Sequence, residues 1–202
     1  ALFGDTLAFV REVDGVQRMF TGPVDFTAGT GGPWTAMAAA EGGDRAPCWA
    51  PEGTRLTFAS NRSGDWDIWT ADPDGANAVN LTHTGGDQTQ PAYSADGGSI
   101  AYVADGALWR MDADGANAAA LGATTGIERP QRAMVAGYWI CAGPADGTTG
   151  IGLVRPDGTY RVLAEEAVNL ADPELAPAAS ARLLTPEAAA WVTRADGGVV
   201  NL

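Results

Sequence analysis

Imperfect copies of one unit recur along this sequence, and this repetition constrains the fold more than any other feature. Residues 47–58 (PCWAPEGTRLTF) align without a gap with residues 91–102 (PAYSADGGSIAY), and residues 67–77 align with residues 107–117. Fainter copies of one half or the other lie at residues 7–10, 150–159 and 184–192. The chain must therefore build the same small structure several times.

The short apolar stretches between glycines and prolines predict strands. They are rich in aromatic and β-branched residues, and Asp-Gly or Gly-Gly pairs, which are common in hairpin turns, separate them. We expect strands at residues 6–10, 55–59, 68–70, 99–103, 108–111, 138–141, 151–154 and 190–193.

Equivalent positions in the copies indicate how the units pack. Successive equivalent positions are separated by 49, 44, 39 and 50 residues. A period in the forties with several short strands per unit is typical of β-propeller blades. One small sheet cannot bury both of its faces, so neighbouring blades bury one another's aromatic faces. The equivalent positions are Phe9, Phe58, Tyr102, Cys141 and Trp191.

We therefore predict an all-β fold, a β-propeller of four-stranded blades, with residues 1–202 as a single domain. Blades of about 40 residues indicate five of them. Part of a six-bladed ring is the alternative, because both ends are short of a strand or two. A β-sandwich accounts for short strands but not for the repeated unit. The sequence begins at Ala1 without an initiator methionine, so we expect a processed chain or a piece of a longer one.

Charge and composition exclude several classes of partner. The chain has 12 basic and 25 acidic residues, a net charge of −13, so nucleic-acid phosphates and anionic lipids would repel it. No run of about 18 apolar residues is present, so we expect no membrane span. Cys48 and Cys141 are expected to be small buried residues, too far apart to form a disulfide.

The inventory of reactive residues argues against an enzyme. The single histidine, His83, falls in a predicted loop, and no Gly-x-Ser-x-Gly elbow or phosphate-binding loop is present. Residues 72–77 and 112–117 resemble the start of a calcium loop, but Leu81 and Leu121 stand where its acidic ligand is required. We interpret both segments as hairpin turns and predict no cofactor, with calcium as the alternative.

One part of the sequence resembles a known family. Residues 80–102 (NLTHTGGDQTQPAYSADGGSIAY) resemble the repeat of TolB-like β-propellers: Leu-Thr, a Gly/Asp loop, Pro-x-aromatic-Ser-Pro-Asp-Gly and Ile-Ala-Phe. Residues 59–69 resemble its Ser-x-Arg continuation, although the Pro-Asp-Gly turn is Pro-Glu-Gly at 51–53 and Ala-Asp-Gly at 95–97. The family includes the periplasmic TolB propeller, which binds a lipoprotein, and propellers attached to serine peptidases. The resemblance implies a bacterial binding protein in the periplasm or outside the cell.

The loops that enter the innermost strands each carry a carboxylate, and in a propeller these loops surround one mouth of the central channel. Converging carboxylates would attract a cation, a peptide amino terminus or a basic side chain, unless adjacent arginines neutralise them. The candidate ligand-binding residues are Asp44, Arg45, Asp87, Gln88, Glu128, Arg129, Asp172 and Glu174.

Together these observations predict a non-enzymatic propeller that recognises a protein or peptide at one channel mouth. Two alternatives remain. The first alternative is the propeller domain of a larger hydrolase or peptidase. The second is a lyase- or glycosidase-like enzyme that acts at the channel. The alternatives require a catalytic domain outside this chain or a cluster of titratable residues on the innermost strands.

Overall fold

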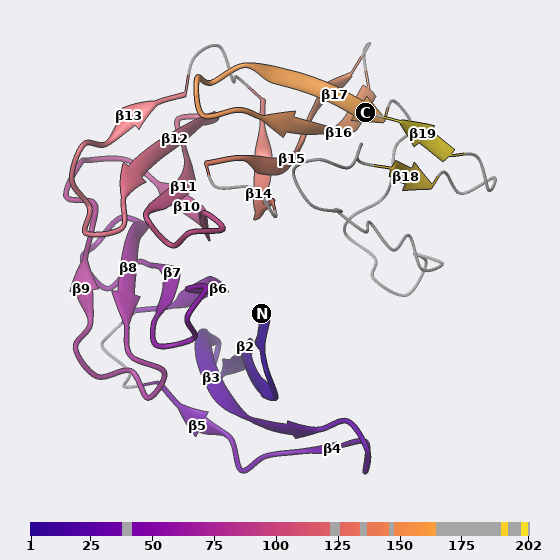
Figure 1. The fold of residues 1–202 in the computed structure, drawn as a ribbon. Coiled ribbons are helices and arrows are strands. Elements are labelled where there is room, and N and C mark those ends of the chain that lie inside the picture. The colour runs from indigo at the N-terminus through magenta and orange to yellow at the C-terminus, as the bar shows by residue number, and fades with distance from the viewer. Residues whose placement is uncertain are drawn as a thin grey trace. The chain divides into compact units, whose positions relative to one another are not determined.

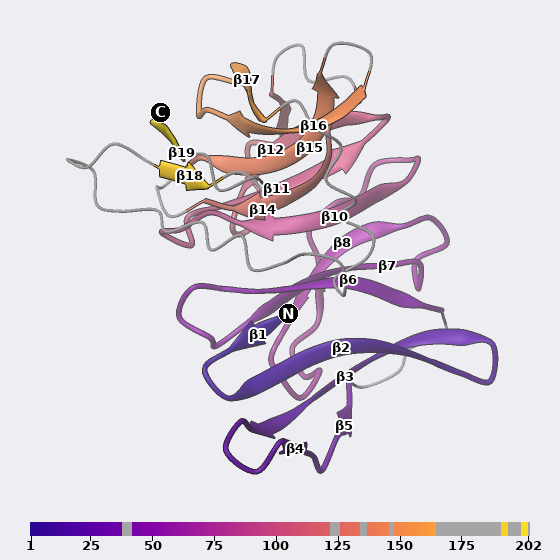
Figure 2. The ribbon, with the colours of Figure 1, turned by 90° about the vertical axis from the view of Figure 1, so that its right-hand side faces the viewer.

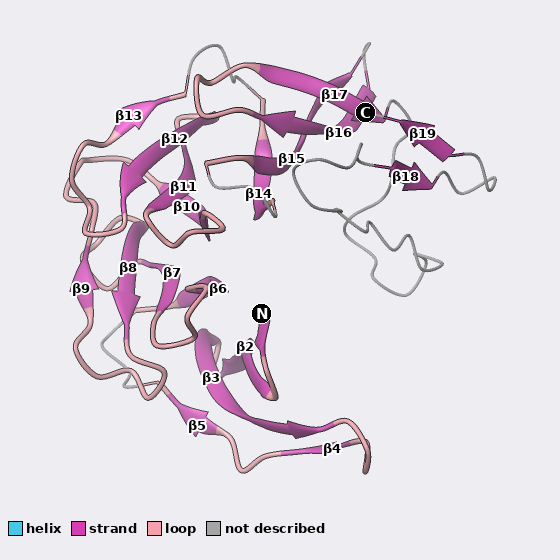
Figure 3. Ribbon diagram, viewed as in Figure 1, coloured by secondary structure: helices cyan, strands magenta, loops and turns pink. Residues whose placement is uncertain are grey.

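The computed structural model describes residues 1–37, 42–121, 126–133, 137–145, 148–164, 191–193 and 199–201. The chain divides into two compact units, Ala1–Glu165 and Glu166–Leu202. In the second unit the described part is one hairpin, β18 (Trp191–Thr193) paired with β19 (Val199–Asn201). The described residues form strands and loops without a helix (Figure 3), so none of them forms a helix that would cross a membrane.

The first unit consists of sheets in which each strand pairs antiparallel with the next strand of the chain. Sheet 1 contains β1 (Leu2–Phe3), β2 (Thr6–Val13), β3 (Val16–Asp25), β4 (Thr30–Gly31) and β5 (Thr35–Ala36). Sheet 2 contains β6 (Asp44–Trp49), β7 (Leu56–Ser60), β8 (Asp67–Ala71) and β9 (Val79–Asn80). Sheet 3 contains β10 (Gln88–Tyr93), β11 (Ser99–Ala104), β12 (Ala107–Asp112) and β13 (Ala119–Ala120). Sheet 4 contains β14 (Glu128–Arg132), β15 (Trp139–Ala145), β16 (Thr148–Val154) and β17 (Tyr160–Ala164).

Sheets 1 to 4 follow one another in chain order, with their faces packed together (Figure 2). The first strands of sheets 2, 3 and 4 lie side by side, because β6 contacts β10 and β10 contacts β14. The short strands β9 and β13 lie at the opposite, outer edge of their sheets (Figure 1). We call β6, β10 and β14 the inner strands.

The hydrophobic core is divided into layers, one between each pair of neighbouring sheets. Phe58 of sheet 2 packs against Met19 of sheet 1, and Tyr102 of sheet 3 packs in the layer that it shares with Ile68 of sheet 2. The layer between sheets 3 and 4 contains the fully buried Trp139. Each large apolar side chain contributes about 1.5–3 kcal/mol by leaving water, so the sheets stabilise one another as the repeat predicts.

Sheet 1 departs from the repeat, because β3 is ten residues long and pairs with both β4 and β5. The connecting segment places the Trp34 ring directly against two glycines. A Cβ atom on Gly22 would lie 2.6 Å from the Pro33 carbonyl oxygen and 2.7 Å from Trp34 Cε3, and one on Gly31 would lie 2.8 Å from the same ring. Residues without side chains are therefore required beneath this tryptophan.

These observations confirm the predicted all-β propeller class with four-stranded antiparallel blades, and every predicted strand overlaps an observed one. The number of blades and the extent of the domain stay predictions. Cys141 is buried, as expected, and burial raises the pKa of its thiol to about 12. Cys48 is only half-buried, because it lies on an inner strand that borders a groove.

Candidate functional site

A groove of about 420 Å³ lies along the inner strands. Each of these strands contributes the same window of three consecutive residues, and Ala1 lies beside them. We call this the inner-strand groove; its described lining is Ala1, Ala46, Pro47, Cys48, Gln90, Pro91, Ala92, Arg129, Pro130 and Gln131.

A β-bulge shapes the groove at the same point of each inner strand. The pairing register shifts between Arg45 and Cys48 in β6, and at the corresponding positions of β10 and β14. The residue before each proline has a left-handed backbone, with φ of 52° at Ala46, 55° at Gln90 and 51° at Arg129. This conformation is uncommon for residues other than glycine, and a following proline disfavours helical backbone further. Such positions persist only where the surrounding structure imposes them, which is frequent at binding sites.

The predicted carboxylate Asp44 is not free at the rim of the groove. Its Oδ1 accepts a hydrogen bond from Arg62 Nη2 at 2.7 Å, and the two side chains are only 7% and 10% exposed. Arg62 also donates from Nε to Ser60 Oγ at 2.9 Å and lies over the rings of Phe58 and Trp69. The Ser-x-Arg motif of residues 60–62 thus neutralises Asp44 and ties the start of β6 to the end of β7.

The other predicted residues of sheets 2 and 3 are also engaged locally. The Arg45 guanidinium lies 3.7 Å from the centre of the Trp66 ring, and the Asp87 carboxylate accepts a hydrogen bond from Trp66 N at 3.2 Å. Gln88 is 3% exposed and donates from Nε2 to the carbonyl oxygens of Gly85 and Gly86. Asp87 is therefore the exposed carboxylate of this group, and it lies outside the lining of the groove.

The acidic residues of the three loops stand at different positions in the pairing register. Arg45 pairs with Ala59, Thr89 with Val103 and Glu128 with Ala142, which makes Glu128 the counterpart of Arg45 rather than of Asp44. Among the predicted residues whose side chains the structure describes, a set that excludes Glu128, Arg129 alone lines the groove. Asp172 and Glu174 lie outside the described residues.

The single histidine lies in a second, shallower depression of about 300 Å³, beside Ser63 and Asp67. These are the residue types of a hydrolytic triad, but their hydrogen bonds differ from one. Ser63 Oγ donates directly to Asp67 Oδ2 at 2.5 Å, and the same carboxylate accepts from Asn80 Nδ2 and Thr82 Oγ1. Within the described residues no hydrogen bond joins His83 to either group. The hydrogen bonds of Asp67 hold two loops together, and the described contacts do not include the serine–histidine pair of a triad.

The calcium-like segments are hairpin turns, as the sequence predicts. Asp72 Oδ2 accepts from Asn77 Nδ2 at 2.6 Å, and Asp74 Oδ1 accepts from the backbone N–H of Ala76 at 2.9 Å. Asp112 and Asp114 make the same contacts in sheet 3. The carboxylates thus cap the backbone of their own turns.

A family profile described as "PD40: TolB beta propeller domain" matches residues 4–188. The match spans most of the chain. The chain belongs to this family. The sequence resemblance to TolB-like propellers is thereby confirmed.

The chain spans only part of the length of the relatives that it matches here. A protein TolB homolog of Chlorobaculum tepidum is 44% identical over 50 residues, which cover 25% of this chain and 12% of that protein. The structure of a putative TolB from Agrobacterium tumefaciens has a TM-score of 0.66 at 22% identity over 79% of this chain and 61% of that one. A puromycin-hydrolyzing peptidase of Mycobacterium tuberculosis has a TM-score of 0.61 at 16% identity, over 82% of this chain and 28% of that one. These two structures share the fold.

Proposed function

We propose that this TolB-like propeller domain is a non-enzymatic binding module that holds a protein or peptide segment in the inner-strand groove. The observation that carries the proposal is the groove itself, since three successive sheets place the same strained bulge along one cavity. Binding sites in rigid repeat folds are formed where several repeats present equivalent positions on one surface.

The residues of the groove are better suited to binding a polypeptide than to catalysing a reaction. Its walls are prolines and alanines, and its polar groups are the side chains of Gln90, Arg129 and Gln131. No cluster of three or more histidine, cysteine or acidic side chains suitable for a metal occurs among the described residues. The serine and the aspartate near His83 have a structural explanation, because Asp67 accepts hydrogen bonds from Ser63 and Thr82.

The location of the protein follows from the same proposal. TolB-like propellers of bacteria are expected in the periplasm or outside the cell, and we propose that compartment for this chain. A peptidase whose catalytic domain lies outside this chain is the second candidate, favoured by the shared fold of the puromycin-hydrolyzing peptidase.

A peptide selection tests the binding proposal. Random peptides displayed on phage are selected on the immobilised chain, and the recovered peptides are measured by fluorescence anisotropy against wild type and Gln131→Trp. Gln131 is exposed, lies in β14 and lines the groove, so a tryptophan there fills the cavity on a strand position that suits it. We expect an affinity loss of about tenfold or more, because the peptide and the indole compete for one space.

The matched control is Ala119→Trp, an exposed position on the outermost strand β13. It adds the same side chain far from the groove, and thermal unfolding verifies that both variants fold. Recovered peptides that bind Gln131→Trp as tightly as wild type, or a selection that recovers none, contradict the proposal.

A further inference from the structure

Arg129 is the one charged side chain among the described residues that line the inner-strand groove. This is unexpected in a chain with a net charge of −13.

The acidic side chains near the groove that the structure describes do not cancel this charge. Asp44 is neutralised by Arg62 in a buried pair, and Asp87 is bound to the Trp66 backbone outside the lining. Within the described residues the Arg129 guanidinium makes no hydrogen bond or ion pair, and Arg129 is exposed. Its charge is therefore available to a ligand.

The backbone beneath Arg129 is fixed by the neighbouring sheet. Gln90 occupies the same bulge position on β10, and its Oε1 accepts a hydrogen bond from the backbone N–H of Arg129 at 2.5 Å. This contact joins the inner strands of sheets 3 and 4 and holds Arg129 in its left-handed conformation. Because the backbone is fixed before a ligand binds, only the side chain of Arg129 has to be ordered on binding.

The walls beside Arg129 restrict how a ligand binds. Pro47, Pro91 and Pro130 have no backbone N–H, so a partner strand cannot continue a regular hydrogen-bond ladder along these positions. Recognition must rest on packing against prolines and alanines and on the polar side chains. An arginine in this setting binds a carboxylate through two parallel hydrogen bonds.

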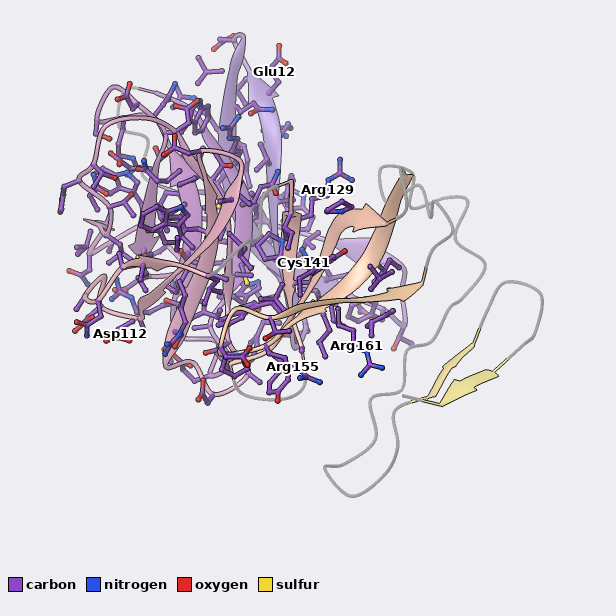
Figure 4. All side chains as sticks on the ribbon, turned by 90° about the horizontal axis from the view of Figure 1, so that it is seen from above. Glu12, Asp112, Arg129, Cys141, Arg155 and Arg161 are labelled. Carbon is purple, nitrogen blue, oxygen red and sulfur yellow. The ribbon has the colours of Figure 1, made fainter. Side chains whose placement is uncertain are left out.

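We propose that the inner-strand groove selects an acidic polypeptide segment, whose aspartate, glutamate or C-terminal carboxylate pairs with the Arg129 guanidinium while its neighbouring residues pack on the proline walls. The inference rests on the proposed function, because it specifies the partner of the same groove. Figure 4 shows Arg129 toward the same end of the sheets as Glu12, with Asp112 and Arg155 toward the opposite end.

Charge-matched peptides test the inference. Each peptide recovered in the phage selection is resynthesised in two forms, one with its acidic residues and free C-terminus, and one with the corresponding amides. Wild type is expected to bind the acidic form about 10- to 100-fold more tightly, the range for a charge-assisted hydrogen bond. Raising the salt concentration should lower the ratio of the affinities for the acidic and the amide form.

Two variants assign the preference to Arg129. Arg129→Asn removes the charge with a residue that tolerates a left-handed backbone, so it is expected to bind both forms equally. Arg129→Glu is expected to prefer peptides in which lysine replaces the acidic residue. Arg161→Asn is the control, because Arg161 is exposed on β17 and lies outside the lining of the groove.

The possible failures are distinguishable. A selection that recovers no peptide, or peptides unaffected by Gln131→Trp, overturns the proposed function and this inference with it. Peptides that are blocked by Gln131→Trp but bind equally in acidic and amide forms overturn the inference alone. A preference for acidic peptides that survives in Arg129→Glu also overturns it.

Discussion

Arg62 and Asp44 form an ion pair that joins the loop after β7 to the start of β6 across 18 positions of the sequence, with Nη2 and Oδ1 2.7 Å apart. Sheet 3 has a different arrangement at the same place. There Gln88 stands opposite Ala104 as Asp44 stands opposite Ser60, and Gly106 takes the place of Arg62. Sheet 2, which has an arginine after its second strand, thus begins with a carboxylate, and sheet 3, which lacks this arginine, begins with an amide.

Removing the carboxylate should destabilise the fold strongly. Asp44→Asn leaves the buried Arg62 guanidinium without its counterion, and breaking such a pair costs about 3–5 kcal/mol. Urea unfolding measures the loss. The double variant Asp44→Leu/Arg62→Met removes both charges and should lose much less than Asp44→Asn alone; an equal loss would show that charge pairing is not the cause.

A methyl group at Gly22 should destabilise sheet 1. The Pro33 carbonyl oxygen and the Trp34 ring occupy the space that Gly22→Ala requires, and overpacking of this kind costs about 1–3 kcal/mol. Gly85→Ala is the matched control, because nothing lies within 4 Å of its Cβ position and its φ is not positive. Its stability should stay within about 0.5 kcal/mol of wild type. Equal losses for both substitutions would refute the steric explanation.

Stability should fall in alkali because of Cys141. Its thiol keeps its proton in the folded chain up to about pH 12, whereas its ordinary pKa is 9.0. Between these values the unfolded state binds fewer protons, so the free energy of unfolding falls by up to about 1.4 kcal/mol per pH unit. Urea unfolding between pH 9 and about pH 10 should show a falling free energy of unfolding for wild type, to which the raised pKa values of Tyr93, Tyr102 and Tyr160 also contribute. The slope should be shallower in Cys141→Ala than in wild type, and an unchanged slope there would contradict the assignment to Cys141.

Calcium should not stabilise the chain through its Asp-x-Asp-Gly turns. Asp72 is bound by Asn77 and lies 3.4 Å from Arg55 Nη1, so binding a cation requires these contacts to break. Differential scanning calorimetry with calcium and with a chelator should give the same Tm. A calcium-dependent increase that disappears in Asp72→Asn/Asp112→Asn would establish a site and refute this prediction.

The sequence predicts the repeated part of the fold well because the signal is local. Pro-aromatic-turn-strand units recur, and the residues that face the preceding sheet, such as Phe58 and Tyr102, are large and apolar at constant positions. Sheet 1 is harder to predict, because the extension around Trp34 depends on contacts with Gly22 and Gly31. The repeat in the sequence does not indicate these contacts.

The candidate site is predicted less well because it depends on register. Three loops with an acidic residue before a proline look equivalent, but the acidic residues stand at different distances from it, and a bulge fixes which side chain faces which way. The role of Arg62 is also hidden, since the motif that contains it gives no indication of a partner 18 positions away. Arg129 is recoverable from the sequence as the residue before a proline, aligned with Ala46 and Gln90.

The prolines of the inner strands have a consequence beyond ligand recognition. A strand that ends a sheet can recruit the same strand of another molecule, and repetition of that event produces fibres. Pro47, Pro91 and Pro130 interrupt the donor row on the edges where sheets 2, 3 and 4 would otherwise be open to such growth. The residues that give the groove its walls thus also protect a chain built of repeated strands from polymerising through them.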